Sequence, residues 1–186
     1  MEPGRPNYRR QLSVFLIFLG VTILYVFLMD QLIWPLGSGD IIRLETARTV
    51  ANLQDVLTEF REFTPSKLEK AIDSVYLDFV FILLYGGLMI SAIKYFGLLA
   101  DHDLVERASR FFIVVVVLAC VCDVVENILI LRTLMAGPTE LGVRMTYNLA
   151  AAKFSMIIIS VMFIFLELAY VGLSRIVSRK DLKLSK

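Results

Sequence analysis

Four long apolar segments alternate with polar ones along the chain and predict four membrane-spanning helices. The apolar segments cover residues 12–34, 75–99, 111–135 and 147–174. Each is long enough for an α-helix to cross the hydrocarbon core, which takes about 20 residues. The first is too long for the core of a signal peptide, so we expect it to remain as a span. The pattern predicts an all-α protein, an antiparallel bundle of four transmembrane helices in which sequence neighbours pack together.

The polar segment 35–74 is the longest between two spans, and it contains a second kind of periodicity. Its apolar residues recur at helical spacing and are Val50, Leu53, Val56, Leu57, Phe60 and Phe63. This spacing predicts an amphipathic helix over residues 46–63 that lies on the membrane or caps the bundle. After the break at Thr64 and Pro65, the sequence from Ser66 to Glu69 fits a capping box, and nothing interrupts the helix that it would start before the second span.

The distribution of lysine and arginine predicts the orientation of the spans. Three basic residues lie in segment 1–11, three in 94–110 and five in the tail 175–186, whereas the short turn 136–146 contains only Arg144. Basic residues are enriched on the cytoplasmic side of membrane proteins. We therefore expect both termini in the cytoplasm and the predicted cap on the extracytoplasmic side.

The third span contains three polar residues in an otherwise apolar run. Asp123, Glu126 and Asn127 are spaced i, i+3 and i+4, so they share one face of the helix. A charged side chain at the centre of a span costs roughly 2.5–3.5 kcal/mol on insertion scales, and such residues face the protein interior. This face is therefore expected to meet polar partners on other helices.

The other spans offer those partners. Asp78 and Tyr85 lie in the second span, Lys153 begins a stripe in the fourth span that continues to Glu167, and Asp30 lies near the end of the first. A rise of about 1.5 Å per residue brings most of them to a similar depth. We expect one polar pocket beneath the 46–63 helix, with Glu167 as a second polar position deeper in the membrane and Asp30 at the periphery.

Charge in this pocket is unbalanced. Asp78, Asp123 and Glu126 supply three carboxyl groups against one lysine, Lys153. An unpaired carboxylate in a medium of low dielectric constant takes up a proton or another cation. Asp123 and Glu126 are therefore the predicted titrating groups, and Lys153 their counter-ion.

Composition excludes several function classes. Hydrophobic residues make up 58% of the 186 residues, above the 45–50% typical of soluble domains, and the net charge of +1 gives no reason to expect a nucleic-acid partner. The single histidine, His102, and the two cysteines Cys120 and Cys122 do not form a metal or haem motif, so no metal and no cofactor is expected. The chain also lacks a glycine-rich phosphate loop and a Ser–His or Cys–His arrangement, which argues against catalysis.

Four short motifs resemble small bacterial inner-membrane proteins with four helices and no assigned function. The motifs are 44–47 (LETA), 77–85 (LDFVFILLY), 123–127 (DVVEN) and 152–154 (AKF). The resemblance implies that six residues belong to one recurrent constellation, namely Asp78, Tyr85, Asp123, Glu126, Asn127 and Lys153. It also implies a location in the bacterial inner membrane, but no substrate.

Three functions remain open at this point. The leading hypothesis is the binding or passage of a small solute, a cation or a proton, which predicts an opening toward the cap. A structural or accessory subunit would use the polar network only to fix helix packing and would contain no cavity. A lipid-modifying enzyme would use the carboxyl groups and Lys153 for acid–base chemistry and would open sideways to the bilayer. The small-residue pairs Gly87/Ser91 and Ala151/Ser155 could pack helices within one chain, in a homo-oligomer or against a partner membrane protein.

Overall fold

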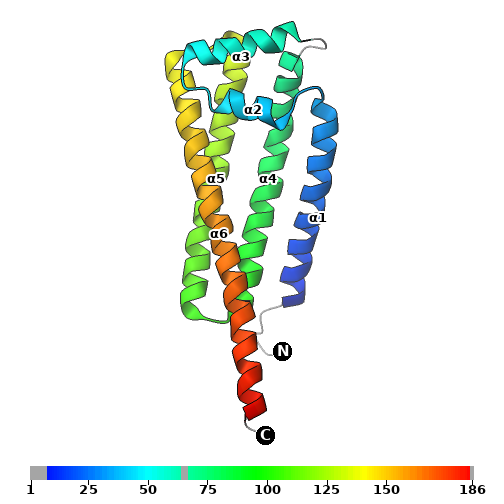
Figure 1. Cartoon of the computed structure of the whole chain (residues 1–186), viewed down its shortest axis with the longest axis vertical. Helices are drawn as coiled ribbons and strands as arrows, with labels where there is room; N and C mark the ends of the chain where they lie inside the picture. Colours follow the sequence, from blue (N-terminus) through cyan, green and yellow to red (C-terminus); the bar gives the residue numbers. More distant parts are fainter. Residues whose placement is uncertain (1–7, 64–66, 185–186) are drawn as a thin grey trace.

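The computed structural model describes residues 8–63 and 67–184, with side chains described up to residue 174. Within these ranges every regular element is a helix, which confirms the all-α prediction. The elements are α1 (Tyr8–Ile33), α2 (Ser38–Glu45), α3 (Val50–Glu62), α4 (Lys67–Ala100), α5 (Asp103–Ala136) and α6 (Glu140–Leu184). The four long helices run side by side, and α2 and α3 lie across one end of them (Figure 1). We call this the cap end, and the opposite end, where α4 turns into α5, the turn end.

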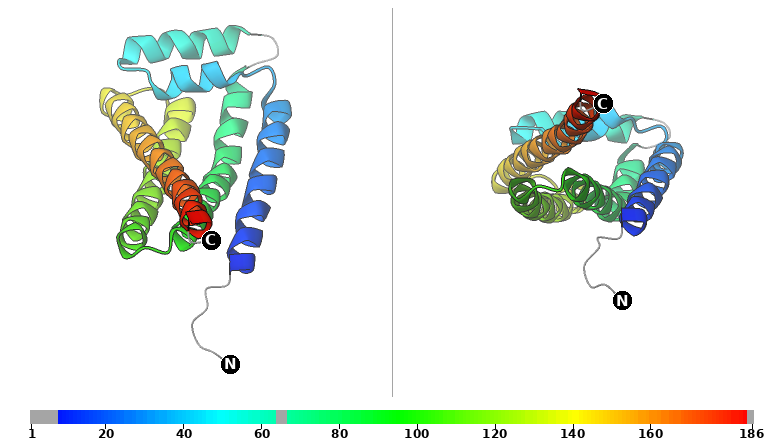
Figure 2. Two further views of the ribbon diagram at one scale, coloured as in Figure 1. Left: turned by 60° about the horizontal axis from the view of Figure 1, so that its bottom comes forward. Right: turned by 90° about the horizontal axis from the view of Figure 1, so that it is seen from below.

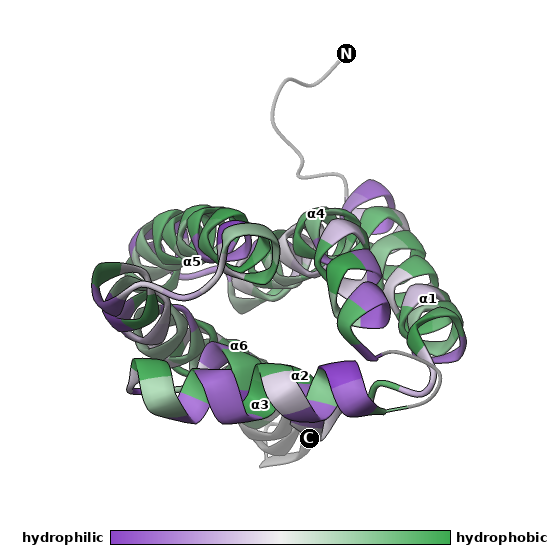
Figure 3. Cartoon of the chain, turned by 90° about the horizontal axis from the view of Figure 1, so that it is seen from above, coloured by the Kyte–Doolittle hydropathy of each residue, from purple (hydrophilic) through white to green (hydrophobic). Residues whose placement is uncertain are grey.

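The four long helices are the membrane spans. Each of α1, α4, α5 and the part of α6 up to Ser174 is long and apolar enough to cross a bilayer, which confirms the prediction of four spans. Seen from the cap end, the long helices are mostly apolar along their length, whereas α2 and α3 carry more polar residues (Figure 3). Large apolar side chains such as Phe27 and Leu83 are exposed on the outward faces, where a lipid environment stabilises them.

The spans form a three-helix core with α1 attached at its side. Helices α4, α5 and α6 all pack against one another, while α1 packs mainly against α4 (Figure 2). Neighbours in sequence are neighbours in space, as expected. In a regular four-helix bundle the first and last helices would also pack together, whereas here α6 packs against α4. The interior of the molecule therefore lies between α4, α5 and α6.

Close packing and one hydrogen bond fix α1 on α4. Gly87 of α4 leaves room for the ring of Phe18, which a Cβ atom at this position would overlap. Nearer the cap end, the hydroxyl of Tyr25 donates a hydrogen bond to the backbone oxygen of Leu77 at 2.7 Å. Since the hydrocarbon core offers no water, this bond satisfies a polar group that lipid would leave unpaired.

The cap consists of two helices, which corrects the predicted extent of the amphipathic helix. The expected helix began at Thr46, but the chain turns there, α3 begins at Val50, and α2 precedes the turn. Local capping explains both starts. The side chain of Asp40 accepts a hydrogen bond from the Gly37 N–H at 3.0 Å, and Thr49 accepts one from the Asn52 N–H at 3.2 Å.

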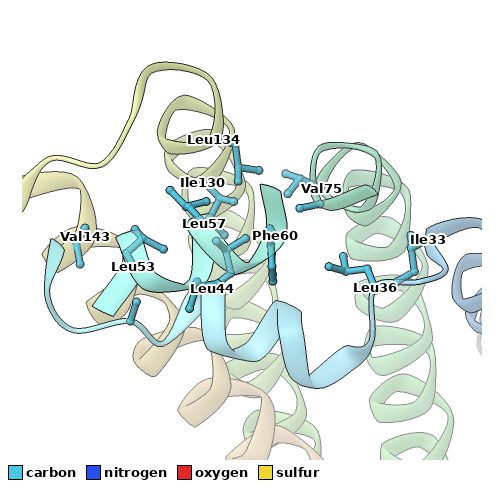
Figure 4. Close-up of a cluster of buried hydrophobic side chains, with 13 residues drawn as sticks. Ile33, Leu36, Leu44, Leu53, Leu57, Phe60, Val75, Ile130, Leu134 and Val143 are labelled. Carbon is cyan, nitrogen blue, oxygen red and sulfur yellow. The ribbon is translucent and has the colours of Figure 1, made fainter. Parts of the chain in front are cut away.

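The apolar face of α3 attaches the cap to the spans. Leu53, Val56, Leu57 and Phe60 are buried in one cluster with residues of α2, α4, α5 and α6 (Figure 4). Phe60, with 0% exposure, is among the largest fully buried side chains of the described residues. Burial of large apolar side chains stabilises a contact by roughly 1.5–3 kcal/mol each, so the cap is a packed part of the fold.

Two ion pairs fix the orientation of α2. Its Asp40 carboxylate lies 2.9 Å from Lys67 Nζ at the start of α4, and Arg43 forms a bidentate pair with Glu59 of α3 at 3.2 and 2.8 Å. The pair with Lys67 is mostly buried, whereas the Arg43 pair is about half exposed. Although burial raises the pKa of Asp40, the Gly37 N–H and Lys67 together hold it below its usual value.

Helix α4 continues without interruption from the cap into the second span, as predicted. Its expected capping box includes Ser66, which lies outside the described residues, as does Arg5 of the basic N-terminal segment. Gly137, at φ 90°, makes the turn between α5 and α6, a conformation that favours glycine. The C-terminal part of α6 extends beyond the turn end (Figure 1).

Candidate functional site

The polar stripe of the third span faces the interior of the three-helix core. The exposed fractions of Asp123, Glu126 and Asn127 on α5 are 4%, 0% and 2%. Helix α5 packs against both α4 and α6, so this stripe meets side chains from two helices. The free energy needed to place these polar groups in a membrane span is therefore offset by contacts within the protein.

Lys153 of α6 supplies the counter-charge. Its Nζ lies 2.9 Å from Asp123 Oδ1 and 2.8 Å from Glu126 Oε2, and all three side chains are almost fully buried. The ammonium group also lies 4.8 Å from the centre of the Phe154 ring. A buried charge is stable only when it is paired, and the two carboxyl groups meet this need.

Helix α4 completes the network at two points. The Tyr85 hydroxyl donates a hydrogen bond to Asp123 Oδ2 at 2.8 Å, and Asn127 Nδ2 donates one to Asp78 Oδ2 at 2.7 Å. The structure thus brings all six residues of the predicted constellation together over about two helical turns between α4, α5 and α6, and we call this group the cap-end cluster.

A seventh member, Glu45, was missed by the sequence analysis. Glu45 is the last residue of α2, and its Oε1 lies 3.7 Å from Lys153 Nζ. Burial raises the pKa of Glu45 to about 7, more than Lys153 lowers it, and Asp78 and Asp123 raise it further by repulsion. The group over the cluster therefore belongs to α2, and not to the 46–63 helix that we expected there.

Two predicted secondary residues lie outside the cluster. Asp30 is exposed near the end of α1, because α1 packs mainly on α4 and turns its other faces outward. Glu167 is 2% exposed, but it lies near the turn end and pairs with Ser109 of α5. The Lys153 to Glu167 stripe is thus buried at both positions without forming one pocket.

The hydrogen bonds of the cluster are unequally shared. Both oxygens of Asp123 accept hydrogen bonds, from Lys153 and from Tyr85. Neither oxygen of Glu126 accepts one from a described residue in good geometry, and only Oε2 has the ion pair with Lys153. Glu126 is therefore the carboxyl group with unused hydrogen-bonding capacity.

The cluster is closed toward the cap and toward the lipid. A cavity of about 10 Å³, near the smallest volume that holds one water, lies between the cap and the ends of α5 and α6. A groove of about 440 Å³ opens sideways between α4 and α5, with the apolar and small residues Ile82, Gly86 and Val121 in its wall. Lys153, Asp123 and Glu126 line neither of them.

No group of three or more His, Cys, Asp or Glu side chains is placed to hold a metal ion within the part of the chain that the structure describes. Lys153 Nζ occupies the point on which the carboxyl groups converge.

Comparison of the chain with models of protein families, with curated proteins and with solved structures finds no match. The resemblance to small bacterial four-helix membrane proteins therefore stays a prediction, and the functional argument depends on the site.

Proposed function

We propose that this membrane protein binds protons in the cap-end cluster. Three carboxyl groups, those of Asp123, Glu126 and Glu45, converge on the single ammonium group of Lys153. The observation that carries the proposal is Glu126, which is fully buried and whose Oε1 has no hydrogen-bond partner among the described residues. Together with Asp78, which accepts a hydrogen bond from Asn127, the cluster contains four carboxyl groups against one lysine, so protons on other carboxyl groups would remove excess negative charge.

Hydrogen bonding identifies which groups take those protons. Asp123 accepts from Lys153 and Tyr85 on its two oxygens, an arrangement that fits a carboxylate. Glu126 has the ion pair of its Oε2 with Lys153 at 2.8 Å, but its buried Oε1 accepts no hydrogen bond from a described residue, so its ionised form is less well satisfied than that of Asp123. Glu126 is therefore the principal proton-binding group, with Glu45 as the second.

A proton fits the cluster better than a metal cation does. A metal ion would need several oxygen ligands around one point. That point is occupied by Lys153 Nζ, at 2.9 and 2.8 Å from Asp123 and Glu126. A proton needs no such space, since it binds to a single carboxyl oxygen.

Proton binding is connected to the cap through Glu45. This residue ends α2, and its side chain is the cap's contribution to the cluster. A change in its charge alters its attraction to Lys153 and hence the free energy with which the cap packs on the bundle. The protein would thereby convert proton occupancy into a change in cap stability.

The distribution of basic residues supports an orientation with both termini in the cytoplasm and the cap on the other side of the membrane, which the resemblance suggests is the bacterial inner membrane. The cap-end cluster would then lie nearer to the extracytoplasmic side of the membrane. Labelling of single cysteines placed in α3 and in the α4–α5 turn, in intact cells, tests this orientation. Labelling of the turn and protection of α3 would contradict it.

The proposal is tested by infrared spectroscopy of the full chain in lipid nanodiscs, with glutamate labelled by ¹³C. A buried protonated glutamic acid gives a carbonyl band that is separate from the bands of carboxylates. We expect such a band at neutral pH, its loss in Glu126→Gln, and no change in Asp30→Asn, which alters an exposed carboxyl group of α1. Thermal unfolding with added sodium, potassium, magnesium or calcium chloride tests cation binding in parallel.

A structural role is the second candidate, because the cluster lines neither of the two nearby cavities. In that case Glu126 is permanently ionised, Glu126→Gln removes no acid band at any pH, and no salt changes the unfolding temperature specifically. Lipid modification would need a sideways opening to the carboxyl groups, and the groove between α4 and α5 does not include them.

A further inference from the structure

A second buried carboxyl group lies at the turn end, away from the cap-end cluster. Glu167 of α6 is 2% exposed, and its Oε1 lies 2.6 Å from the hydroxyl oxygen of Ser109 on α5. Gly97 of α4 forms the third side of this position. A Cβ atom at Gly97 would lie 2.5 Å from Ser109 Oγ and 3.1 Å from Glu167 Oε1, so a glycine leaves the room for this pair.

The hydrogen bonds around Ser109 indicate the protonation state of Glu167. Ser109 Oγ also lies 2.7 Å from the backbone oxygen of Val105. A hydroxyl has one proton to donate, while a carboxylate oxygen and a carbonyl oxygen only accept. An ionised Glu167 would therefore leave one of the two short contacts without a proton. A protonated Glu167 donates to Ser109 Oγ, which donates to Val105, and both contacts are satisfied.

The other oxygen of Glu167 supports the same form. Glu167 Oε2 is buried and has no hydrogen-bond partner among the residues that the structure describes. A buried oxygen without a partner is far less costly on a neutral acid than on a carboxylate, because the charged form loses more hydration.

A cavity at the turn end gives this position access to protons. It has a volume of about 320 Å³, and both Gly97 and Ser109 line it. The charged or titratable residues in its wall are Lys94 of α4, Asp101 and His102 of the turn, and Asp103, Glu106 and Arg110 of α5. From α6, Tyr170 packs edge to face against His102, with ring centres 6.0 Å apart. The cavity thus connects the Glu167 pair to an exposed, ionisable surface.

An apolar layer separates the two carboxyl sites. Glu167 follows Lys153 by 14 residues on α6, about 21 Å along the helix. Met89 and Ile93 of α4 and Val116 of α5 are buried at the levels between them. The rings of Phe112 and Phe163 stack across this layer with centres 4.1 Å apart.

We infer that Glu167 and Ser109 form a second proton-binding site, which exchanges protons with the turn-end cavity independently of the cap-end cluster. The bound species is a solvent proton, which converts the Glu167 carboxylate to a carboxylic acid with Ser109 Oγ as its hydrogen-bond acceptor. The inference does not rest on the proposed function of the cap-end cluster, because no residue is shared between the sites.

Infrared spectra of the full chain in lipid nanodiscs, with ¹³C-labelled glutamate, test the site. We expect Glu167→Gln to remove one protonated glutamic acid band that Glu126→Gln leaves in place. Ser109→Ala should retain this band and shift it to higher frequency, because the acid loses its hydrogen-bond acceptor. Glu106→Gln, which changes an exposed carboxyl group of the same cavity, is the matched control and should leave the band unchanged.

Wild-type protein transferred from H₂O to D₂O gives a measurement that needs no variant. The band assigned to Glu167 should shift to lower frequency as the proton exchanges through the cavity. The inference is overturned if Glu167→Gln changes no acid band, if Ser109→Ala leaves the band at its wild-type frequency, or if the wild-type spectrum shows no band that is sensitive to deuterium. Loss of the Glu167 band in Glu126→Gln would also overturn the inference, because the two sites would then not be independent.

Discussion

Lys153 holds the cap-end cluster together, because its ammonium group contacts Asp123 and Glu126 at once. Replacement of Lys153 by methionine leaves buried carboxyl groups without a counter-ion. Removal of one partner from a buried ion pair costs about 3–5 kcal/mol. We expect a loss of this order in unfolding free energy at neutral pH and a smaller loss at acidic pH, where protons neutralise the carboxyl groups. Chemical or thermal unfolding at both pH values measures the difference.

A second substitution controls this experiment. Asp123→Asn, added to Lys153→Met, removes one of the unpaired carboxylates and should restore part of the stability at neutral pH. An equal loss in Lys153→Met at neutral and acidic pH, with no restoration by Asp123→Asn, would show that packing of the lysine stem, and not its charge, stabilises the bundle.

Two tyrosines make comparable hydroxyl contacts with different acceptors. Tyr85 donates to the carboxyl group of Asp123 at 2.8 Å, whereas Tyr25 donates to the backbone oxygen of Leu77 at 2.7 Å. Hydrogen bonds to ionised acceptors are stronger than those between neutral groups. Tyr85→Phe should therefore lower the unfolding free energy by about 1–2 kcal/mol, and Tyr25→Phe by less. Equal losses would argue that Asp123 is not ionised.

Sequence spacing predicted much of this residue-level arrangement but not its seventh member. Asp123, Glu126 and Asn127 interrupt an apolar run at helical spacing, and such residues face the protein interior because their exposure to lipid is costly. Glu45 has no comparable signal, since it lies in a polar segment where carboxyl groups are usually solvated. Its burial depends on how α2 packs over α6, a contact between segments that are far apart in the chain.

At the scale of whole elements, the docking of α2 should depend on pH. Burial raises the pKa of Glu45 from 4.5 to about 7, so the docked cap binds an additional proton between these values. Protonated Glu45 therefore stabilises the docking of α2 fully below pH 4.5, and this stabilisation is lost as the pH rises to about 7. The total change is at most on the order of 3 kcal/mol. Hydrogen exchange of the α2 amides across this pH range measures it.

Glu45→Gln is the variant that isolates this effect. A glutamine keeps the size of the side chain and removes its titration, so the protection factors of the α2 amides, which are corrected for the intrinsic pH dependence of exchange, should become nearly independent of pH. Glu62→Gln changes an exposed carboxyl group of α3 and should keep the wild-type pH dependence. Protection that increases with pH in the wild type would reverse the predicted sign and contradict the role of Glu45.

The attachment of α1 gives a second prediction at this scale. A Cβ atom at Gly87 would overlap the ring of Phe18, whereas Gly20 of α1 has no atom within 4 Å of such a position. Gly87→Leu should push α1 away from α4, with faster hydrogen exchange in α1 and a lower unfolding temperature. Gly20→Leu should change neither quantity. Unaltered exchange of α1 in Gly87→Leu would mean that other contacts fix this helix.

The sequence predicted the elements better than their arrangement. Length and apolar composition determine the four spans, because only helices satisfy their backbone within lipid. The start of α3 could also have been predicted, because Thr49 is a typical N-cap residue and accepts a hydrogen bond from the Asn52 N–H. The prediction relied on the apolar periodicity alone and therefore placed the start at Thr46. The sideways position of α1 could not be predicted, because an almost uniformly apolar helix presents similar faces to protein and to lipid.

At the scale of the whole molecule, the described residues form two buried carboxyl sites, one toward the cap end and one toward the turn end of the bundle. The stripe of Lys153, Ser160 and Glu167 on α6 suggested polarity that continues through the membrane, and all three residues are indeed buried. The layer of Met89, Ile93 and Val116 between the sites comes from α4 and α5. The spacing of polar residues on α6 contains no sign of this layer. The sequence therefore predicted the polar positions of Lys153 and Glu167 but not the apolar residues that separate them.

This apolar layer has an electrical consequence. A membrane potential falls mainly across the region of lowest dielectric constant, and moving one elementary charge through it corresponds to about 2.3 kcal/mol per 100 mV. The two carboxyl sites lie on opposite sides of that region, so a potential that draws a proton inward at one end drives it outward at the other. The relative occupancy of Glu126 and Glu167 would thus record the sign of the voltage across the membrane.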